Sequence, residues 1–186
     1  MAAKSSSEGE RLDSHELERF ETVVLPHLDA AYTLARYLTR NDHDAEDVVQ
    51  DAYLRALKYF GGFRGEDSSA RAWVLAIVRN TAYTWRRRQH SDTLGTEFNE
   101  KLHSDAVADE HPEATLLKRD AGESLTRALD QLPIEFREVI VLRELEGLSY
   151  KEISDVAGVP VGTVMSRLSR ARQRLQEALC RRGVLT

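Results

Sequence analysis

The chain has 186 residues, of which 41% are hydrophobic, and a formal net charge of −5. This length suits one medium domain or two small ones, and the negative charge argues against a protein that coats nucleic acid without specificity. The single cysteine, Cys180, excludes a disulfide framework or a cysteine-rich zinc site within one chain and suits a reducing compartment. No apolar run is long enough to span a bilayer, and the first residues lack the apolar core of a signal peptide. We therefore expect a cytoplasmic protein without membrane insertion.

Charge is distributed unevenly along the chain. Residues 68–91 carry five arginines and no acid, and residues 163–186 carry six arginines against one glutamate. Residues 42–51 are acidic and contain no lysine or arginine. This pattern favours two contacts with nucleic acid and at least one basic protein partner, although any single charged run is most often a solvated face.

The first predicted element follows a polar stretch. Residues 1–13 contain few large apolar side chains and predict a disordered tail. Residues 14–39 have apolar side chains at helical spacing, from Leu17 to Leu38. Pro26 lies inside this pattern and has no backbone N–H, so we expect a bend or break near Leu25.

Residues 44–60 predict a second helix with one buried face. Asp44 is its expected N-cap, and Asp47 takes the capping-box position. The face opposite the apolar stripe carries Asp47, Gln50, Asp51 and Leu54. Acids in the first turn suit the helix dipole, whereas Asp51 lies beyond that turn and is less well explained by it.

Residues 61–69 predict a loop, and residues 70–88 predict a third helix. Its expected inward side chains are Trp73, Ala76 and Ile77, with Thr81 as a further candidate. Aromatic and basic side chains alternate on this helix, which is typical of single-stranded DNA binding because bases stack on rings while arginines meet phosphates. The alternative is a purely structural role, in which the two tryptophans are core residues and the arginines lie at a solvent-exposed end of the helix. That alternative is favoured for Trp73 and stays open for Trp85.

The second half begins with an acidic segment. Residues 92–112 carry six acids against one lysine and predict a flexible linker between domains; the two histidines in it have no partners for a metal site. Residues 113–130 predict a helix, and Pro133 begins another that ends at Gly147. The packing residues expected on that helix are Val139, Ile140, Leu142 and Leu145.

Residues 148–174 predict a helix-turn-helix. Ser149 caps the first helix, with Glu152 in the capping-box position, and Gly158 ends it. Pro160 opens the second helix, whose buried stripe contains Val164, Leu168, Ala171 and Leu175. The opposite face carries Gly162, Thr163, Ser166, Arg167 and Arg170. A helix of this kind enters a DNA major groove, although an ordinary helical hairpin with a basic face has the same pattern.

Taken together, these segments resemble a bacterial RNA polymerase sigma factor of the sigma-70 family, of the small extracytoplasmic-function type. DAEDVVQDAYLRAL and FRGEDSSARAWVLAIVRNTAYTWRRR are similar to sigma region 2, and LPIEFREVIVLRELEGLSYKEISDVAGVPVGTVMSRLSRARQRL is similar to region 4. The resemblance implies an all-α protein of two small helical domains joined by an acidic flexible linker. Its expected parts are region 2 at 14–91, the linker at 92–112, region 4 at 113–182 and a tail at 183–186.

The resemblance also implies roles for particular residues. Contact with the clamp helices of the polymerase beta-prime subunit is expected from Asp47, Gln50, Asp51 and Leu54. Recognition and melting of the −10 element are expected from Phe63, Arg64, Ser68, Asn80, Tyr83 and Arg87. Recognition of the −35 element is expected from Gly162, Thr163, Ser166, Arg167 and Arg170. The implied partners are core RNA polymerase, including its beta flap, promoter DNA and an anti-sigma factor. No cofactor or enzymatic activity is implied.

Two other functions are consistent with parts of the sequence. A repressor or activator could bind DNA alone through the helix-turn-helix, but this leaves the acidic helix and the Trp- and Arg-containing helix unexplained. A metal-dependent nuclease or hydrolase could use Asp42, Asp44, Glu46 and Asp47 as ligands. Helix capping explains most of these acids more simply, and no nucleophile–base pair is evident.

Overall fold

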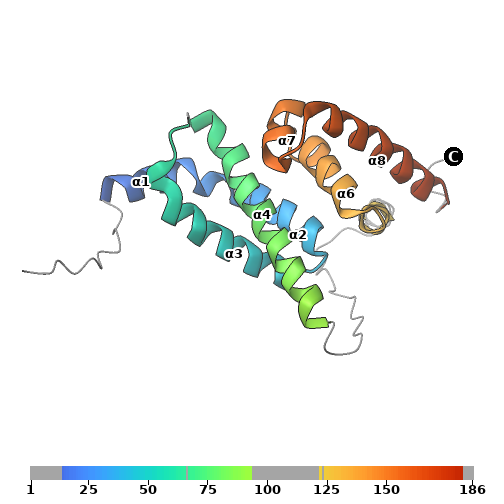
Figure 1. The fold of residues 1–186 in the computed structure, drawn as a ribbon, viewed down its shortest axis with the longest axis horizontal. Coiled ribbons are helices and arrows are strands. Elements are labelled where there is room, and N and C mark those ends of the chain that lie inside the picture. The colour runs from blue at the N-terminus through green and yellow to red at the C-terminus, as the bar shows by residue number, and fades with distance from the viewer. Residues whose placement is uncertain (1–13, 66, 94–121, 123, 182–186) are drawn as a thin grey trace, which may run out of the picture.

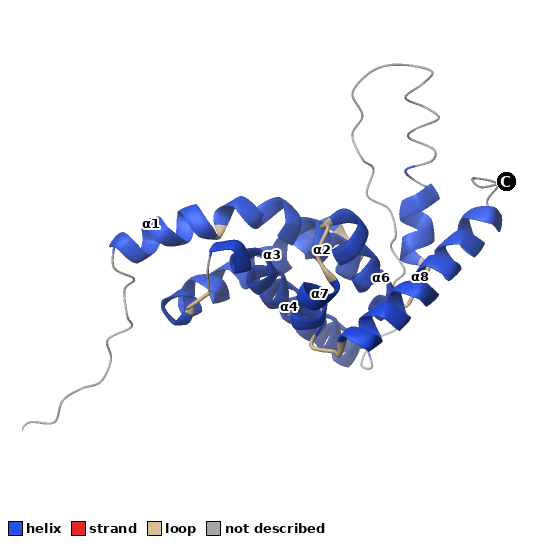
Figure 2. Ribbon diagram, turned by 90° about the horizontal axis from the view of Figure 1, so that it is seen from above, coloured by secondary structure: helices blue, strands red, loops and turns tan. Residues whose placement is uncertain are grey.

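The computed structural model describes residues 14–65, 67–93, 122 and 124–181, and within these the regular elements are all helices (Figure 2). This confirms the predicted all-α class. The N-terminal part contains α1 (Ser14–Val23), the short 3-10 helix η1 (Leu25–His27), α2 (Leu28–Thr39), α3 (Asp42–Tyr59), the 3-10 helix η2 (Phe60–Gly62) and α4 (Asp67–Thr93). Helices α2, α3 and α4 pack against one another around a shared apolar core. Figure 1 shows α4 crossing in front of α2.

The predicted break at Pro26 is present. Helix α1 ends at Val23, and Pro26 lies in the 3-10 turn that separates it from α2. The proline ring would clash with the preceding turn of a continuous helix and supplies no N–H to it, so the chain starts a new helix at Leu28.

The predicted start of α3 was wrong. The helix begins at Asp42, and its N-cap is Asn41, whose side-chain oxygen accepts a hydrogen bond from the Asp44 N–H at 3.1 Å. Asp44 therefore lies in the first turn, where a carboxylate favours the positive end of the helix dipole. The predicted buried face is correct, since both valines and all three alanines of α3 lie in the core.

The expected inward face of α4 was also partly wrong. Its fully buried side chains include Val74, Leu75, Val78 and Ala82, with Thr81 also buried. Trp73 and Ile77 lie at the edge of the core and are partly buried. The reason is that α4 is covered on more than one side, because it contacts α2 and α3 within its own domain and α7 (Tyr150–Ala157) from the other. A single-stripe pattern could not anticipate this.

The C-terminal part consists of residues 124–130, α6 (Ile134–Ile140), the π-helical segment η3 (Val141–Leu145), α7 and α8 (Val161–Arg181). Val139, Ile140 and Leu142 are buried as predicted, but Leu145 is 48% exposed. The wider turn of η3, in which the Glu146 N–H bonds to the Val141 carbonyl at 3.0 Å, shifts the register and turns Leu145 outward.

The predicted helix-turn-helix is confirmed, except that Leu175 of its expected buried stripe is only partly buried. Ser149 and Glu152 form a complete capping box at the start of α7, with hydrogen bonds of 3.2 and 2.7 Å. Gly158 follows α7 with a φ of 65°, a left-handed conformation that glycine adopts without a Cβ penalty. Helix α8 then buries Val164, Leu168 and Ala171 against α6 and α7.

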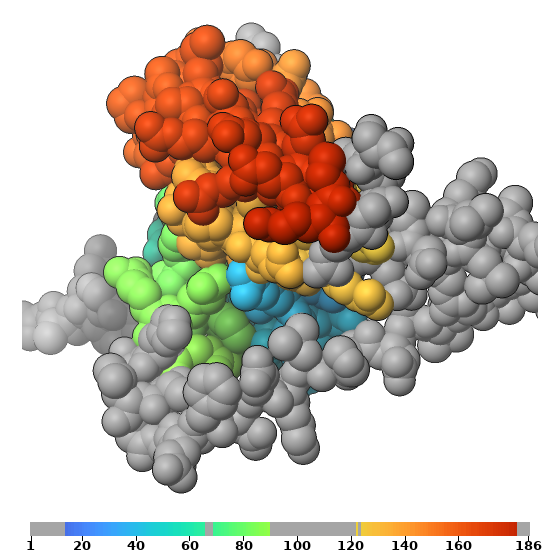
Figure 3. Space-filling model, turned by 90° about the vertical axis from the view of Figure 1, so that its right-hand side faces the viewer, coloured from blue at the N-terminus to red at the C-terminus, as the bar shows by residue number. Residues whose placement is uncertain are grey.

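The two halves of the chain form one compact body. Helix α7 packs on α4, and α6 packs on α2, so that the buried residues form one continuous core cluster. Figures 1 and 3 show the C-terminal helices lying over α4 and α2. Most of the predicted linker, residues 94–112, lies outside the described residues, and its first two residues complete α4.

Candidate nucleic-acid interface

Helix α8 presents a polar face opposite its buried stripe. Gly162, Ser166 and Arg170 are exposed, and Thr163 and Arg167 are half-buried. The Ser166 hydroxyl donates to the Thr163 carbonyl at 3.0 Å. All of the residues predicted to read duplex DNA therefore share one side of one helix, with small side chains near its N-terminus and arginines farther along.

Two other arginines of α8 have partners within the C-terminal part. Arg172 donates to Glu144 at 2.7 Å, and the Arg174 guanidinium lies 5.0 Å from the ring centroid of Phe136. These contacts attach the middle of α8 to α6 and η3. Arg167 and Arg170 are the arginines of α8 that are predicted to face the DNA groove.

Helix α3 presents an acidic face with an apolar side chain in it. Asp47 and Gln50 are exposed, and Leu54 is 62% exposed. Asp51 lies between them and pairs with Arg55 one turn later, at 2.9 Å. Acids on this face would repel DNA phosphates, so the face suits contact with a basic protein surface rather than with DNA.

Helix α4 carries four of the predicted −10 residues, because Ser68, which was expected on the loop, lies in its first turn. Asn80 and Arg87 are exposed, whereas Tyr83 is half-buried. The Tyr83 hydroxyl donates to a Glu138 carboxylate oxygen at 3.1 Å. Burial and then the Glu138 charge raise the pKa of Tyr83 to about 12, so it is a neutral donor.

The loop before α4 differs from the prediction at Phe63. This side chain was expected on an open loop but is 7% exposed. Its ring centroid lies 4.8 Å from that of Trp73 and 6.0 Å from that of Phe60, so it anchors the loop to the core. Arg64 is exposed beside it, and the side chain of Ser68 lies outside the described residues. Trp73 and Trp85 are both partly buried and pack against the edge of the core.

Sequence reasoning missed the charged residues that join the two halves. Glu138 is completely buried and accepts from Arg79 Nε at 2.5 Å. Burial raises the pKa of the Glu138 carboxyl, while the hydrogen bonds from Arg79 and Tyr83 oppose that rise. The signal in the sequence was the spacing of Glu138, four residues before the predicted packing residue Leu142 and therefore on the same helix face.

Arg137 is a second buried charge at the same junction. It donates to the backbone carbonyls of Tyr37 at 2.8 Å and Leu132 at 3.1 Å. Desolvation lowers its pKa to about 10, which still leaves the guanidinium charged near neutral pH. Nearer the start of α4, Arg71 donates to the Glu146 carbonyl at 2.6 Å and pairs with the Glu146 carboxylate.

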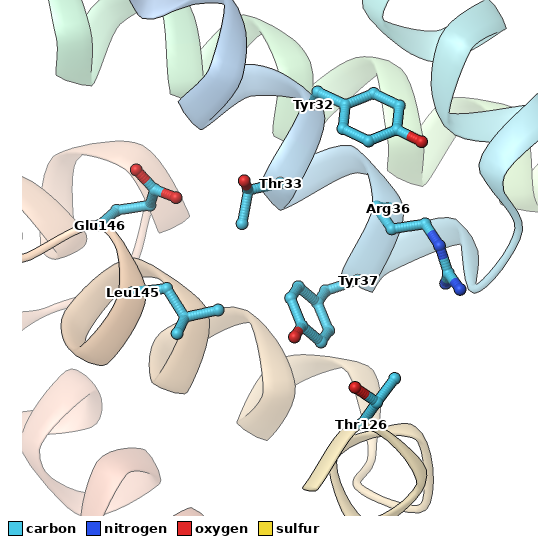
Figure 4. A pocket seen from close by; sticks show the side chains of 7 residues that line it. All are labelled: Tyr32, Thr33, Arg36, Tyr37, Thr126, Leu145 and Glu146. Carbon is cyan, nitrogen blue, oxygen red and sulfur yellow. The ribbon is translucent and has the colours of Figure 1, made fainter. Parts of the chain in front are cut away.

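A cleft of about 490 Å³ lies at this junction, between α2 and the start of the C-terminal part (Figure 4). Its lining residues are Tyr32, Thr33, Arg36, Tyr37, Thr126, Leu145 and Glu146. Arg36 is already paired with Asp42, and Glu146 with Arg71. The charged groups of the cleft therefore serve contacts within the protein.

The described residues offer neither a metal site nor a membrane-spanning helix. Within residues 14–65, 67–93, 122 and 124–181, no three His, Cys, Asp or Glu side chains gather in a way that could hold a metal ion. None of the described helices is long and apolar enough to cross a bilayer.

Comparison with known families identifies the two halves. The family model described as Sigma-70 region 2 matches residues 23–91, and the model described as Sigma-70, region 4 matches residues 122–175. The chain is 35% identical over 178 residues to the RNA polymerase sigma-H factor of Pseudomonas aeruginosa, with 91% of each protein covered. The chain belongs to the sigma-70 family.

Its relatives specify the group within that family. The sigma factor is 35% identical over 172 residues to the ECF RNA polymerase sigma-E factor of Escherichia coli, with 88% of each protein covered. Sigma factors of this extracytoplasmic-function group are transcription initiation factors, and the chain directs promoter-specific initiation with core RNA polymerase. The predicted family and function are thus confirmed.

Solved structures agree with this assignment. The sigma factor RpoE of Bartonella quintana, determined in complex with the anti-sigma factor NepR, matches with a TM-score of 0.69 and 30% identity, covering 87% of this chain and 97% of RpoE. CnrH, determined in complex with the cytosolic domain of CnrY, matches with a TM-score of 0.61 and 26% identity, covering 88% of each chain.

Proposed function

We propose that the sigma factor works in the cytoplasm as a non-enzymatic initiation factor through three separate surfaces. One docks on core polymerase, one binds the −10 element and one reads the −35 element. Coupling two DNA contacts on a single polymerase-bound protein raises the effective concentration of the second contact once the first is made. Each DNA contact can therefore be weak in the free protein.

The −35 element is assigned to the polar face of α8. Arg167 and Arg170 contact guanine or phosphate, because the guanidinium fork matches the two acceptors of guanine and those of a phosphate. Thr163 and Ser166 make closer groove contacts, and Gly162 allows the backbone to approach the DNA. The supporting observation is that these residues share one side of a well-capped helix-turn-helix.

The −10 element is assigned to α4 and the loop before it. Asn80, Tyr83 and Arg87 lie on α4, with exposed Arg64 on the adjoining loop. Melting and flipping a base cost a few kcal/mol, which stacking and phosphate contacts must offset. Because Phe63 is buried, its role is to hold the loop in place, and Arg64 is the better candidate for direct contact. Ser68 stays a prediction from the family pattern.

Docking on the beta-prime clamp helices is assigned to Asp47, Gln50, Asp51 and Leu54 of α3. The observation that carries this proposal is that exposed Asp47 and Gln50 and 62% exposed Leu54 lie together on the acidic face of α3. Burial of Leu54 in a complex would supply affinity, and the acids would select a basic partner surface. The C-terminal part would contact the beta flap.

Run-off transcription with bacterial core polymerase tests this proposal. We expect Asp51→Arg to weaken core binding and initiation at least tenfold while leaving duplex binding by α8 unchanged. Glu18→Arg is the matched control, because it makes the same charge reversal on an exposed residue of α1. Equal loss in both variants would overturn the docking assignment, and strong promoter-specific binding without polymerase would favour a stand-alone regulator.

An anti-sigma factor is proposed as a regulatory partner. The sigma factor RpoE was solved bound to the anti-sigma factor NepR, and CnrH was solved bound to the cytosolic domain of CnrY. Their similarity covers most of this chain, including both halves. Affinity capture of the sigma factor from its own cells, with and without excess core polymerase, tests for a partner that polymerase displaces.

A further inference from the structure

Two side chains of α4 together hold one anion from the other half of the protein. Arg79 donates through Nε to one oxygen of the Glu138 carboxylate at 2.5 Å. Tyr83 donates through its hydroxyl to the other oxygen at 3.1 Å. Arg79 and Tyr83 are one helical turn apart, and the Arg79 guanidinium lies 4.3 Å from the Tyr83 ring centroid.

The pair forms a preorganised pocket for two oxygens on one anion. The Glu138 side chain is completely buried, and that of Arg79 is 20% exposed. Stacking on Tyr83 and a hydrogen bond of 3.2 Å to Asn80 Oδ1 fix the guanidinium plane. Asn80 is itself one of the residues assigned to the −10 element, so this pocket lies inside the proposed DNA-binding face.

A phosphate of a DNA strand presents the same chemistry as this carboxylate. It offers two negatively charged oxygens close together, which arginine binds in the manner of a carboxylate. Glu138 therefore occupies a place that suits a phosphate of single-stranded DNA.

We propose that Arg79 and Tyr83 form a phosphate site for the non-template strand and that Glu138 fills it when the two halves are packed together. The C-terminal part and the DNA strand then compete for the same donors. This inference rests on the proposed role of α4 at the −10 element and adds Arg79, which the sequence analysis did not select.

A second contact along α4 supports the proposal. Arg71 is held by both the backbone carbonyl and the carboxylate of Glu146, which like Glu138 belongs to the C-terminal part. Two arginines of one helix are thus neutralised by two glutamates from the other half. The C-terminal part covers α4 with acids where a nucleic-acid strand would bring phosphates.

The test measures binding of the full chain to a fluorescein-labelled 12-nucleotide oligodeoxythymidine by fluorescence anisotropy. Glu138→Gln keeps the size of the side chain but removes its charge, and we expect it to raise affinity at least threefold over wild type. Adding Arg79→Gln to it should abolish that gain. The double variant should also show a weaker salt dependence than Glu138→Gln alone. Its plot of the log association constant against log salt concentration should be shallower by about 0.7, the value for one phosphate contact on a single strand.

Glu177→Gln is the matched control. It makes the same charge change in the same half, on an exposed residue of α8 whose side chain bonds to Gln173, and should leave affinity at the wild-type value. Circular dichroism checks that each variant is folded. If Glu138→Gln fails to fold, Glu146→Gln loosens the second contact instead, and its gain should likewise depend on Arg79.

Three results would overturn the inference. Glu138→Gln could bind no more tightly than Glu177→Gln, which would make the buried pair a packing contact. A gain that survives Arg79→Gln would place the phosphate site elsewhere, and an unchanged salt slope would exclude a phosphate contact. Failure of the underlying −10 assignment is separately visible, because Asn80→Ala and Arg87→Gln would then initiate normally in run-off transcription.

Discussion

The continuous core predicts that the two halves unfold together. Leu168 of α8 is 1% exposed and belongs to the same cluster as the buried side chains of α2, α3 and α4. Replacing a fully buried leucine by alanine costs about 2–5 kcal/mol, and we expect about 3 kcal/mol for Leu168→Ala. For a cooperative unit of this size, the unfolding midpoint falls by about 2–4 °C per kcal/mol, which gives a decrease of about 6–12 °C.

Differential scanning calorimetry of the full chain tests this expectation. We expect one endotherm in wild type and variant, shifted as a whole. Met165→Ala is the control on the same helix, because Met165 is 53% exposed and a surface change of this kind alters stability by about 0.5 kcal/mol or less.

A different outcome would refute the reasoning. If two endotherms appear and Leu168→Ala moves just one of them, the halves are independent. The shift should then be larger, about 12–24 °C, because a unit of 60–100 residues loses about 4–8 °C per kcal/mol. The same result would also weaken the proposed competition between Glu138 and DNA, which needs the packed arrangement to be populated.

Three further predictions concern the helix-turn-helix. Ser149→Ala should destabilise the protein by about 1 kcal/mol in urea unfolding, because it removes the N-cap acceptor of α7; no change would mean that the cap is replaced by water. Hydrogen bonds with Ser149 hold the pKa of Glu152 below its ordinary value of 4.5, so its contribution to stability is present above pH 4.5 and is lost as pH falls through the lower folded pKa. Glu152→Gln should therefore flatten the acid side of the stability profile, and a profile identical to wild type would contradict this. Gly158→Ala should cost about 1–2 kcal/mol from its positive φ alone, since no atom lies within 4 Å of an added Cβ. Gly162→Ala is its control, because that glycine is helical and equally open; it should keep or raise stability while weakening duplex binding, and a stability loss equal to that of Gly158→Ala would show that positive φ is not the cause.

Much of the local structure could be predicted because its causes are local. The break at Pro26 follows from a missing N–H, and the capping box of α7 follows from two side chains three residues apart. The polar face of α8 follows from helical spacing alone. The start of α3 was missed because Asn41 and Asp44 are both good caps, and backbone geometry chooses between them.

Tertiary contacts decided what the spacing could not. Phe63 is buried because Phe60 and Trp73 provide a neighbouring aromatic surface, although its loop is rich in glycine and polar residues. Leu145 is exposed because the π turn of η3 changes the helical register. In both cases a single side chain is placed by geometry that no pattern of apolar residues encodes.

The sequence by itself determined the helices, the family and the candidate binding faces of this sigma factor. Only the tertiary structure shows that part of one such face, on α4, is covered by the C-terminal part. Arg79 and Glu138 are separated by 59 positions, and Arg71 and Glu146 by 75, so nothing in their local spacing pairs them. They meet because two apolar surfaces, one on each half, are buried together, and a charge carried into that interface must be satisfied by a partner there.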